Sequence, residues 1–451
     1  MMKKRITALL LSLAMIFALG APRALAEDEA KDTLAARSAE AAADDGTAET
    51  ALSAEAAAVT QSEAPDDPAG GAEETGAAEP ASDPEGTLAF ASLRARMFEN
   101  YYPLRALQES IDDLESHDYD WQYDHLRSDL SDIASAQWAA AFVFHESKNV
   151  DMFRTQYDQL HKELEAIADG DKQKDDEETL RQYRNAQNQA VIAGESLYIM
   201  LKSLETQDAA LARTIAQLGR TEREMRLRCE LGQISQLVVD QVSTGVAQAE
   251  SGRATLKMNW EAALLQLKSF VGAELGEPLA LGALPKVTAQ ELAAMDLEAD
   301  LEAAKAASYA LFDAKKQIDD FRENTYDKVI DAYGSNEKRF EVSQVKHALQ
   351  AQKYSYENTV LTFELNFRTL YAQVKDCAQV LEAKRAALAG EERSYAVSAL
   401  KYEQGNISAN ALADAKDELS SAKDEVASAE RELFSKYRSY TWAVDYGILN
   451  S

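Results

Sequence analysis

Few residues of this chain fall into patterns that could perform chemistry. The alternating carboxylates of Asp118, Asp120 and Asp124 suggest calcium, which binds oxygen ligands. The stretch lacks the glycine and the terminal glutamate of an EF-hand loop, and residues 169–171 (Asp-Gly-Asp) lack them too. We therefore interpret residues 118–124 as an aromatic-rich helix end or corner, and we expect no metal site.

The histidines give no support for catalysis or metal binding. They are His117, His125, His145, His161 and His347, and no two are four residues apart, the spacing that places two ligands on one helix face. The sequence contains no Gly-x-Ser-x-Gly elbow, phosphate-binding loop or dinucleotide fingerprint. Its many paired carboxylates need no catalytic explanation on solvent-facing helices. We expect no enzyme and no cofactor.

Charge and cysteine content narrow the class of protein further. The net charge is -30 and no basic stripe is present, which argues against nucleic acid and against an anionic lipid surface as partners. Cys229 and Cys377 are too few for a disulfide framework. Both fall on apolar helix faces described below, so we expect buried thiols.

The N-terminal region has the pattern of an export signal. Lys3, Lys4 and Arg5 precede an apolar run over residues 6–18, and Ala24-Leu25-Ala26 supplies a cleavage site. The sequence predicts a signal peptide over residues 1–26. An uncleaved anchor is the alternative, although the run is shorter than the roughly 20 residues that span a bilayer. No later segment is apolar enough to cross, so we expect no bilayer-spanning segment in the mature chain.

Residues 27–88 form an acidic segment whose only basic residues are Lys31 and Arg37. The remainder is mostly Ala, Gly, Ser, Thr and Pro, with few large apolar side chains. Such a segment cannot bury enough surface to offset the entropy of ordering it. The sequence predicts a disordered, flexible spacer between the signal and the folded part.

Proline positions predict the architecture of the remaining chain. After the spacer, proline occurs only at Pro103, Pro278 and Pro285. Proline inside a helix costs about 3 kcal/mol, so the long proline-free stretches, rich in Ala, Leu, Glu, Lys and Gln, indicate long helices. We expect an all-α fold with a first repeat over residues 89–277, a connection at 278–285 and a second repeat over 286–447.

Two landmarks recur at one offset and support this repeat. Leu197 and Leu370 each precede a tyrosine, and Gly232 and Gly405 each begin a Gly-x-Ile-Ser element. The separation between the two leucines is the same as the separation between the two glycines. Glycine ends a helix by adopting a left-handed conformation, and the serine can cap the next helix. Each repeat should therefore be an antiparallel helical hairpin.

Apolar residues at steps of three and four predict coiled-coil packing in each hairpin. In the second repeat this seam comprises Val360, Phe363, Phe367, Leu370, Val374, Cys377, Leu381 and Leu388. In the first repeat it comprises Leu204, Leu211, Ile215, Leu218, Met225 and Cys229. A helix from about Asn336 to Glu403 would extend roughly 100 Å and would need partners along its length.

The turns and their surroundings resemble a known family. The second turn reads Lys-Tyr-Glu-Gln-Gly-Asn-Ile-Ser over residues 401–408, the first reads Arg-Cys-Glu-Leu-Gly over residues 228–232, and Phe-Val-Gly at 270–272 follows the first hairpin. Two tandem halves of this kind resemble the TolC-like outer-membrane efflux proteins. The resemblance covers about residues 89–447.

The resemblance implies a homotrimer whose hairpins form a tapered α-helical tunnel, so that this chain would be a TolC-like α-barrel protomer. The glycine turns would meet a membrane-fusion adaptor attached to an ABC-type or RND-type pump. The implied adaptor-contact tips are Leu231, Gly232, Gln233, Ile234, Ser235, Gln404, Gly405, Asn406, Ile407 and Ser408. The family tends to place a pore-facing aspartate where this chain has Asp414, which implies a pore gate. The alternative is a solvated helix residue, because surface charges are the norm.

One departure separates the chain from the family, which carries a β-hairpin in each half. Such strands need roughly ten residues of alternating apolar and polar character. The corresponding places, residues 332–336 and 169–171, have room only for turns. We therefore expect no membrane β-strands, and additional helix over residues 118–168.

The sequence supports two hypotheses for function. The first is an efflux or secretion component of the cell envelope, a trimeric helical conduit that docks an adaptor and a pump. The second is a non-transport coiled-coil spacer or scaffold in the envelope. Both require export across the cytoplasmic membrane. The family resemblance points to the outer membrane, and the missing strands are consistent with the outer side of a single-membrane cell.

Overall fold

The computed structural model describes residues 84, 86–144, 147–335 and 339–449. The predicted signal peptide and nearly all of the predicted spacer lie outside the described residues. The spacer was expected to reach residue 88, but Thr87–Leu88 form strand β1 and Leu88 is fully buried. The folded part therefore begins slightly earlier than predicted.

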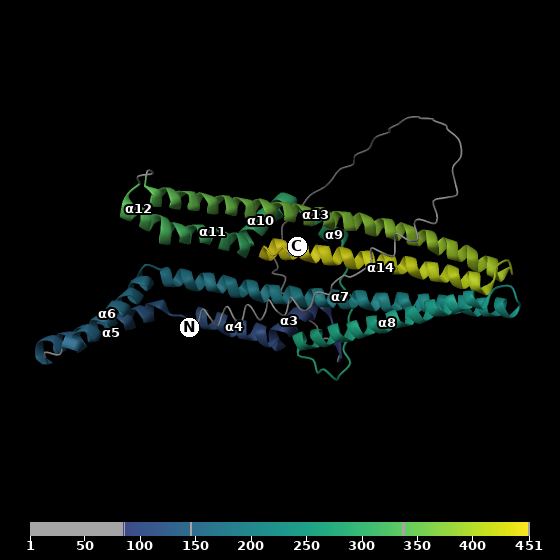
Figure 1. The fold of residues 1–451 in the computed structure, drawn as a ribbon, viewed down its shortest axis with the longest axis horizontal. Coiled ribbons are helices and arrows are strands. Elements are labelled where there is room, and N and C mark those ends of the chain that lie inside the picture. The colour runs from purple at the N-terminus through teal and green to yellow at the C-terminus, as the bar shows by residue number, and fades with distance from the viewer. Residues whose placement is uncertain (1–83, 85, 145–146, 336–338, 450–451) are drawn as a thin grey trace, which may run out of the picture. The chain divides into compact units, whose positions relative to one another are not determined.

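The described chain is almost wholly helical, as the sequence predicts (Figure 1). The elements of the first repeat are α3 (Phe90–Asn100), α4 (Tyr102–Glu115), α5 (Tyr119–Ala139), the π-helix η1 (Ala140–Phe144), α6 (Ser147–Ala168), α7 (Asp171–Glu230) and α8 (Gln236–Val271). Pro103 lies in the first turn of α4, where the missing N–H has no helical partner to lose.

The second repeat follows a connection that contains strand β2 (Ala280–Leu281). Its elements are α9 (Ala289–Ala294), α10 (Leu297–Ala307), α11 (Tyr309–Phe321), the π-helix η2 (Arg322–Asp327), α12 (Lys328–Tyr333), α13 (Phe340–Glu403) and α14 (Ala409–Tyr446). The predicted long helix ends at Glu403 as expected and begins slightly later than Asn336. Among the described residues, no helix is long and apolar enough to cross a membrane.

The two repeats share a common plan. In each, a long helix (α7 or α13) runs to a tight reversal and a shorter helix (α8 or α14) returns beside it. The long helices end at positions 230 and 403, and the returning helices begin at positions 236 and 409. The two positions of each pair are separated by as many residues as Gly232 and Gly405. Both returning helices end at a left-handed glycine, Gly272 and Gly447. The structure thus confirms two tandem antiparallel hairpins.

Each repeat also has a broken outer helix packed on its hairpin. The helix pairs α3–α4 and α10–α11 are interrupted at Tyr101 and Ser308, and their first members have equal length. Each C-terminal glycine packs against its repeat's outer helices. A Cβ added to Gly272 would collide with Asn100, and one added to Gly447 would collide with the backbone of Ser308. Glycine is therefore required there by close approach as well as by its positive φ.

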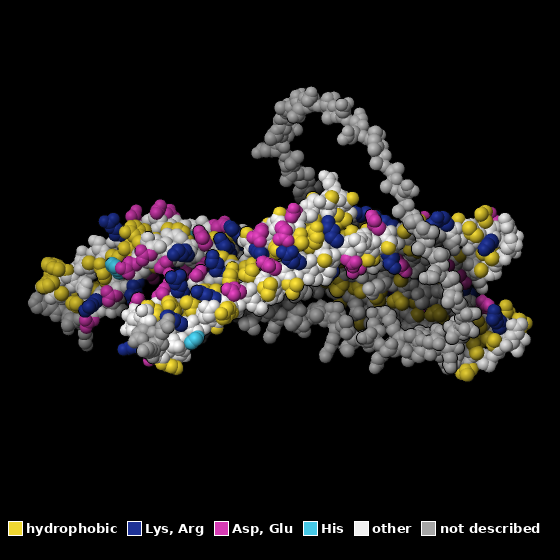
Figure 2. Space-filling model, turned by 90° about the horizontal axis from the view of Figure 1, so that it is seen from above, with side chains coloured by type: hydrophobic (Ala, Val, Ile, Leu, Met, Phe, Trp, Pro, Cys, Tyr) yellow, Lys and Arg dark blue, Asp and Glu magenta, His cyan; other side chains and the backbone are white. Residues whose placement is uncertain are grey.

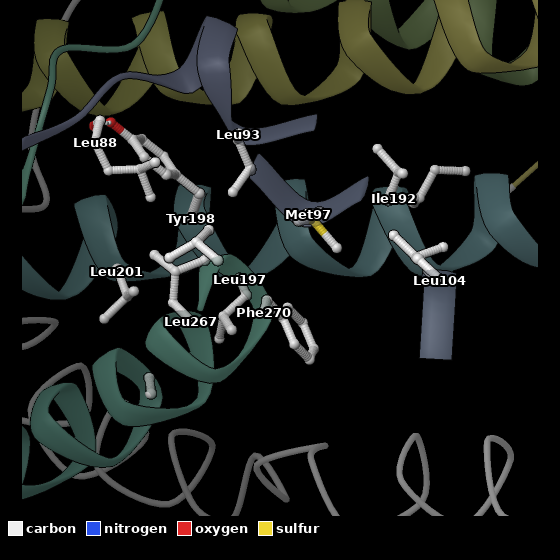
Figure 3. Packing of buried hydrophobic residues seen from close by; sticks show 14 of the residues in the cluster. Leu88, Leu93, Met97, Leu104, Ile192, Leu197, Tyr198, Leu201, Leu267 and Phe270 are labelled. Atoms are coloured by element: carbon white, nitrogen blue, oxygen red, sulfur yellow. Dashed lines mark hydrogen bonds between the residues drawn. The ribbon is translucent and has the colours of Figure 1, made fainter. Parts of the chain in front are cut away.

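Two hydrophobic clusters are centred on the two repeats, and the first also includes Trp442 and Ile448 from the end of the second repeat. In the first, side chains of α3, α7 and α8 interlock around Met97, Leu197 and Tyr198 (Figure 3). In the second, α10, α13 and α14 enclose Phe367 and Val374. The predicted seam of α13 is confirmed at its centre, where Phe363, Phe367, Leu370, Val374 and Leu381 are buried.

The seam predicted for the first repeat differs from the one observed. The fully buried side chains of α7 lie between Ala186 and Leu201, before the predicted seam begins at Leu204. From Leu204 to Cys229 the seam residues are only half-buried, because near the reversal α7 meets α8 and α14 without a covering outer helix. The thiols of Cys229 and Cys377 are half-buried rather than buried, and burial raises the pKa of Cys377.

The starts of the two repeats are joined by a short parallel sheet. Strand β1 pairs with β2, with Thr87 opposite Ala280 and Leu88 opposite Leu281. The buried Tyr198 hydroxyl oxygen lies 2.9 Å from the Leu88 carbonyl oxygen and 2.9 Å from the Gly282 carbonyl oxygen, and its O–H donates to them. A buried hydroxyl needs such partners, so this tyrosine ties both segments to α7.

The additional helix predicted over residues 118–168 is confirmed as the hairpin α5–α6, inserted between α4 and α7 (Figure 1). Asp118 accepts a hydrogen bond from the Trp121 backbone N–H, and so caps α5. The base of the hairpin is fixed to α7, since His117 Nδ1 and the Tyr119 hydroxyl lie 2.7 and 2.8 Å from Asp176 Oδ2.

Candidate functional site at the paired hairpin tips

The two glycine turns close their hairpins with the same hydrogen bonds. Gly232 and Gly405 have φ of 71° and 74°, the left-handed region in which a side chain would be strained. In the first turn the N–H of Gln233 donates to the Arg228 carbonyl at 2.9 Å, and in the second Asn406 donates to Lys401 at 2.8 Å. This is the Schellman arrangement, which satisfies carbonyls left free at a helix end.

The serines of the two turns act differently. The Ser408 hydroxyl accepts a hydrogen bond from the Ala411 backbone N–H at 3.1 Å and caps α14, as predicted. Ser235 occupies the matching position before α8, but its side chain makes no capping hydrogen bond. The prediction of a serine cap is therefore confirmed in the second turn and wrong in the first.

The turns present an exposed surface that includes apolar groups. Of the ten residues predicted as contact tips, all are exposed except Ile234 and Ile407, which are half-buried at equivalent positions. Leu231 is exposed at the first turn, and Leu237 and Tyr402 are exposed beside the turns. Solvated apolar side chains next to two rigid turns suit a contact surface.

Polar pairs between α7 and α14 bring the two turns to one level. Thr206 on α7 accepts a hydrogen bond from Arg431 on α14. One heptad later on α7, Arg213 forms an ion pair with Asp424, which lies one heptad earlier on α14. The next heptad pairs Arg220 with Asp417. These helices are therefore antiparallel in a constant register.

The same number of residues separates Arg220 from Gly232, beyond the end of α7, and Gly405, before the start of α14, from Asp417. The two turns lie at the same end of the hairpins (Figure 1). They form a pair, as a common contact surface would require.

Asp414, the predicted gate residue, belongs to this interface. Its carboxylate lies 3.2 Å from the Arg220 guanidinium, which also binds Asp417. The hydrogen bond to Asp417 is the main reason that the pKa of Arg220 is raised. Asp414 is about half exposed, so it is neither a free carboxylate nor a buried one.

A second polar cluster joins α7 to α14 farther from the tips. The buried carboxylate of Glu195 accepts two hydrogen bonds from Arg438, both at 2.8 Å, and one from the Trp442 indole at 2.8 Å. All the partners of Glu195 are therefore on the other repeat. This cluster and the heptad pairs hold the hairpins together through polar contacts, which sequence reasoning took for solvent-facing charges.

The arrangement offers recognition rather than reaction chemistry. The groove between α7 and α14 is lined by serine, threonine and paired charges, including Arg213, Asp417 and Asp424. In the described part of the chain, no group of three or more His, Cys, Asp or Glu residues is placed to hold a metal. The geometry defines a paired-hairpin helical protein with a double tip.

Comparison with solved structures identifies outer-membrane channels of similar fold. The Neisseria gonorrhoeae channel MtrE is 14% identical over 80% of this chain and 89% of its own, with a TM-score of 0.45. VceC of Vibrio cholerae is 10% identical over 79% and 96%, with a TM-score of 0.42. CmeC of Campylobacter jejuni is 13% identical over 66% and 69%, with a TM-score of 0.39.

At these identities the similarity concerns the fold alone. Neither a protein-family model nor a curated protein sequence matches the chain.

Proposed function

We propose that this protein is the helical conduit subunit of an envelope efflux or secretion system. In this proposal it is exported, assembles as a homotrimer, and docks a membrane-fusion adaptor and its pump at the paired glycine tips. The observation that carries the proposal is the order and direction of the four long helices together with the surface of the two at the edges.

The four helices are arranged in the order α8, α7, α14, α13. The contacts α7–α8, α7–α14 and α13–α14 produce this order, and each helix runs opposite to its neighbour. Helices α8 and α13 are the free edges. If α8 of one copy meets α13 of the next, the alternation of direction continues across the boundary, which permits a closed ring of identical contacts.

The two edges expose apolar side chains at matching levels. Leu237 on α8 and Leu400 on α13 are exposed next to the tips, and Met258 on α8 and Val380 on α13 are exposed farther away. Measured from the helix ends at the reversals, Met258 and Val380 lie at similar levels, about 33 and about 35 Å, since each helical residue adds about 1.5 Å. Apolar groups at the same height on both edges favour lateral association of copies.

Such a ring would gather all the glycine tips at one end. A partner would then meet repeated pairs of turns with exposed leucine and tyrosine beside them, and many weak contacts would act together. A helical-hairpin adaptor is the partner that the family resemblance suggests. Asp414 is proposed to contribute to the gate through its contact with Arg220, since any opening of the tips must alter that contact.

The oligomeric state of the mature protein tests the proposal. Native mass spectrometry and sedimentation at micromolar concentration should show a trimer, and Val380→Arg should convert it to monomer by placing a charge at the α8–α13 contact. Met152→Arg on α6 is the matched control, because Met152 is also exposed but lies outside the four-helix layer. A wild-type monomer that captures no adaptor or transporter from envelope extracts would contradict the proposal.

The alternative function, a structural spacer, predicts a different outcome. A spacer needs no closed ring, so Val380→Arg and Met152→Arg should behave alike and partner capture should not depend on the glycine turns. Replacement of Gly405 by valine separates the two hypotheses. In a conduit it should abolish adaptor capture while helix content is retained, because the left-handed strain is confined to the turn.

A further inference from the structure

A small cavity lies where the connection between the two repeats crosses the α7–α14 contact. Its volume is about 290 Å³, and it is lined by α7, by residues 283–286 of the connection and by α14. Thr206 in its lining lies about 36 Å along α7 from the helix end at Glu230, at about 1.5 Å per residue. The cavity is therefore separate from the glycine tips, and a molecule bound in it would contact both repeats and the connection.

The guanidinium of Arg431 on α14 is an under-used donor in the lining of this cavity. It donates one hydrogen bond, at 2.8 Å, to the hydroxyl oxygen of Thr206 on α7. Arg431 makes no other hydrogen bond and no ion pair with any residue that the structure describes. A guanidinium has five N–H donors, so most of the donors of Arg431 remain for solvent or for a ligand.

The charge of Arg431 is half-buried and has no counter-charge. Burial lowers the pKa of its guanidinium, and no carboxylate offsets the lost solvation. Arg438 and Arg253 are also half-buried, but each is paired with a carboxylate. Figure 2 shows the same pattern on the face that it draws, where Lys and Arg side chains are interspersed with Asp and Glu. Because a half-buried charge without a partner is unfavourable, an anion beside Arg431 would be stabilised.

Two lysines and two carboxylates complete the charged part of the lining. The Lys202 ammonium lies 2.7 Å from the carboxylate of Glu205, and the Lys286 ammonium lies 3.2 Å from that of Glu430. Each carboxylate is thus already paired with a lysine. The lining contains three cations and two carboxylates, and its excess of one positive charge belongs to Arg431.

This charge count favours a carboxylate ligand over a phosphate. A carboxylate carries one negative charge and matches a guanidinium with two parallel hydrogen bonds. A phosphate group carries about 1.5–2 negative charges near pH 7, and the second charge would meet the carboxylates of Glu205 and Glu430. Leu284, Pro285 and two alanines supply the apolar part of the lining, which suits a hydrocarbon group.

We propose that this cavity binds a small organic monocarboxylate, whose carboxylate pairs with Arg431 and whose hydrocarbon part lies against Leu284 and Pro285. The ligand supplies the counter-charge that Arg431 lacks. Because the lining comes from α7, the connection and α14, binding also stabilises the junction of the two repeats. The inference does not rest on the adaptor, the pump or the ring of copies, and it holds for a conduit and for a spacer.

Binding of butyrate to the full-length protein tests the inference. The nuclear magnetic resonance signal of an isotopically labelled butyrate carboxyl carbon should broaden when the protein is added, with a dissociation constant in roughly the millimolar range for a ligand of so few atoms. Butanol and butylammonium have the same hydrocarbon chain without the carboxylate and should not bind. Inorganic phosphate should displace butyrate several-fold less well than unlabelled butyrate does. All samples have equal ionic strength, so that screening of surface charges is not mistaken for binding.

Substitutions locate the binding site. Arg431→Gln should weaken butyrate binding by roughly tenfold or more, because it removes the charged donor. Arg431→Lys keeps the charge without the two parallel N–H groups and should retain part of the affinity. The matched control is Arg253→Gln, since Arg253 is also half-buried but has a carboxylate partner in Asp208 and does not line the cavity. It should leave butyrate binding unchanged.

A second variant tests the site without removing Arg431. Ala283 lines the cavity from an exposed position in the connection, so Ala283→Glu should place a carboxylate there without disturbing the helices, and it should abolish butyrate binding. Circular dichroism verifies the helix content of every variant. The inference is overturned if the wild type does not broaden the butyrate signal, if butanol or butylammonium binds equally well, or if phosphate binds more tightly. It is also overturned if Arg431→Gln and Arg253→Gln have equal effects, or if Ala283→Glu still binds butyrate.

Discussion

Replacing Glu195 should separate the contribution of a buried ion pair from that of an exposed one. The Glu195 side chain is 7% exposed and the Arg438 side chain is 31% exposed, and they join α7 to α14 through two hydrogen bonds of 2.8 Å. The Trp442 indole donates a third, also at 2.8 Å. Glu195→Ala removes the acceptor for all three donors, so that the guanidinium loses its carboxylate and the buried indole N–H loses its partner.

The cost follows from what remains after the substitution. Removing one partner of a buried pair costs about 3–5 kcal/mol, because the other charge is left without compensation. Arg438 is partly solvated, so we expect a cost somewhat below that range, about 2–4 kcal/mol. Glu195→Gln keeps one acceptor oxygen, which can serve the indole, but it loses the charge and replaces the other acceptor with a donor, and it should cost about 1–2 kcal/mol. The double variant Glu195→Leu, Arg438→Met removes both charges. It should cost less than the sum of the costs of Glu195→Leu alone and Arg438→Met alone.

Urea unfolding followed by helical circular dichroism measures these differences. The control is Glu298→Ala, since Glu298 makes the same two-bond contact with Arg368, at 2.9 and 3.3 Å, on an exposed surface. It should change the free energy of unfolding by less than about 1 kcal/mol. Equal costs for Glu195→Ala and Glu298→Ala, or strict additivity in the double variant, would show that Glu195 is not a buried link between the repeats.

Three further substitutions test other contacts. Gly447→Ala should cost about 2–5 kcal/mol in urea unfolding, since its Cβ would lie 2.3 Å from the Ser308 backbone in a left-handed conformation; an unchanged midpoint would contradict the packing. Burial and the hydrogen bond to Asp176 raise the pKa of Tyr119 to about 12. The hydrogen bond of the protonated hydroxyl therefore contributes fully to stability below a pH of about 10, and this contribution is lost as the pH rises through 12. Ultraviolet difference titration against Tyr119→Phe should show this, whereas titration near 10 would mean that the contact is absent. Arg220→Glu would place a third carboxylate against Asp414 and Asp417 of α14. It should lower the free energy of unfolding by about 1 kcal/mol and increase the distance between spin labels placed at the two turns. An unchanged distance would rule out the pairing.

The features that sequence predicted well are those encoded locally. Glycine at 232 and 405 predicts a left-handed turn because few other residues adopt that conformation without strain. The absence of proline and the heptad spacing of Phe363, Phe367 and Leu370 give the length and buried face of α13. Each of these signals lies within a few residues of the structure that it specifies, so one sequence is sufficient to detect it.

The features that sequence missed depend on contacts between distant segments. Glu195 is a charged residue on a long helix, and only the arrival of Arg438, from the far end of the chain, accounts for its burial. The pairs between α7 and α14 looked like solvated charges for the same reason. Their signal was present in the heptad spacing of Arg213 with Arg220 and of Asp417 with Asp424, but it has meaning only when both helices are aligned in opposite directions.

The hairpin α5–α6 shows a different limit. Its helical character was predicted, whereas the exposure of Trp138 and Phe142 was not, because exposure depends on which segments of the described chain pack against them. In sequence these residues have the composition of a buried helix face. Only a structure distinguishes an apolar face that packs against the core from one that projects beyond it.

The two ends of the repeats differ in how closely they match, and this difference bears on function. At the far end the repeats diverge, since the first has the long hairpin α5–α6 where the described residues of the second form η2 and the short α12. At the tips they agree in turn length, glycine conformation and the backbone hydrogen bonds that close the turns. The serine caps differ, and so do the flanking residues, since Cys229 stands at the position equivalent to Tyr402 and Leu231 at the position equivalent to Gln404. Reversing a chain requires no such agreement, because loops of many lengths close at similar cost. Equal turns in a constant α7–α14 register instead keep two tips level, and level tips are what a partner that contacts both of them at once would need.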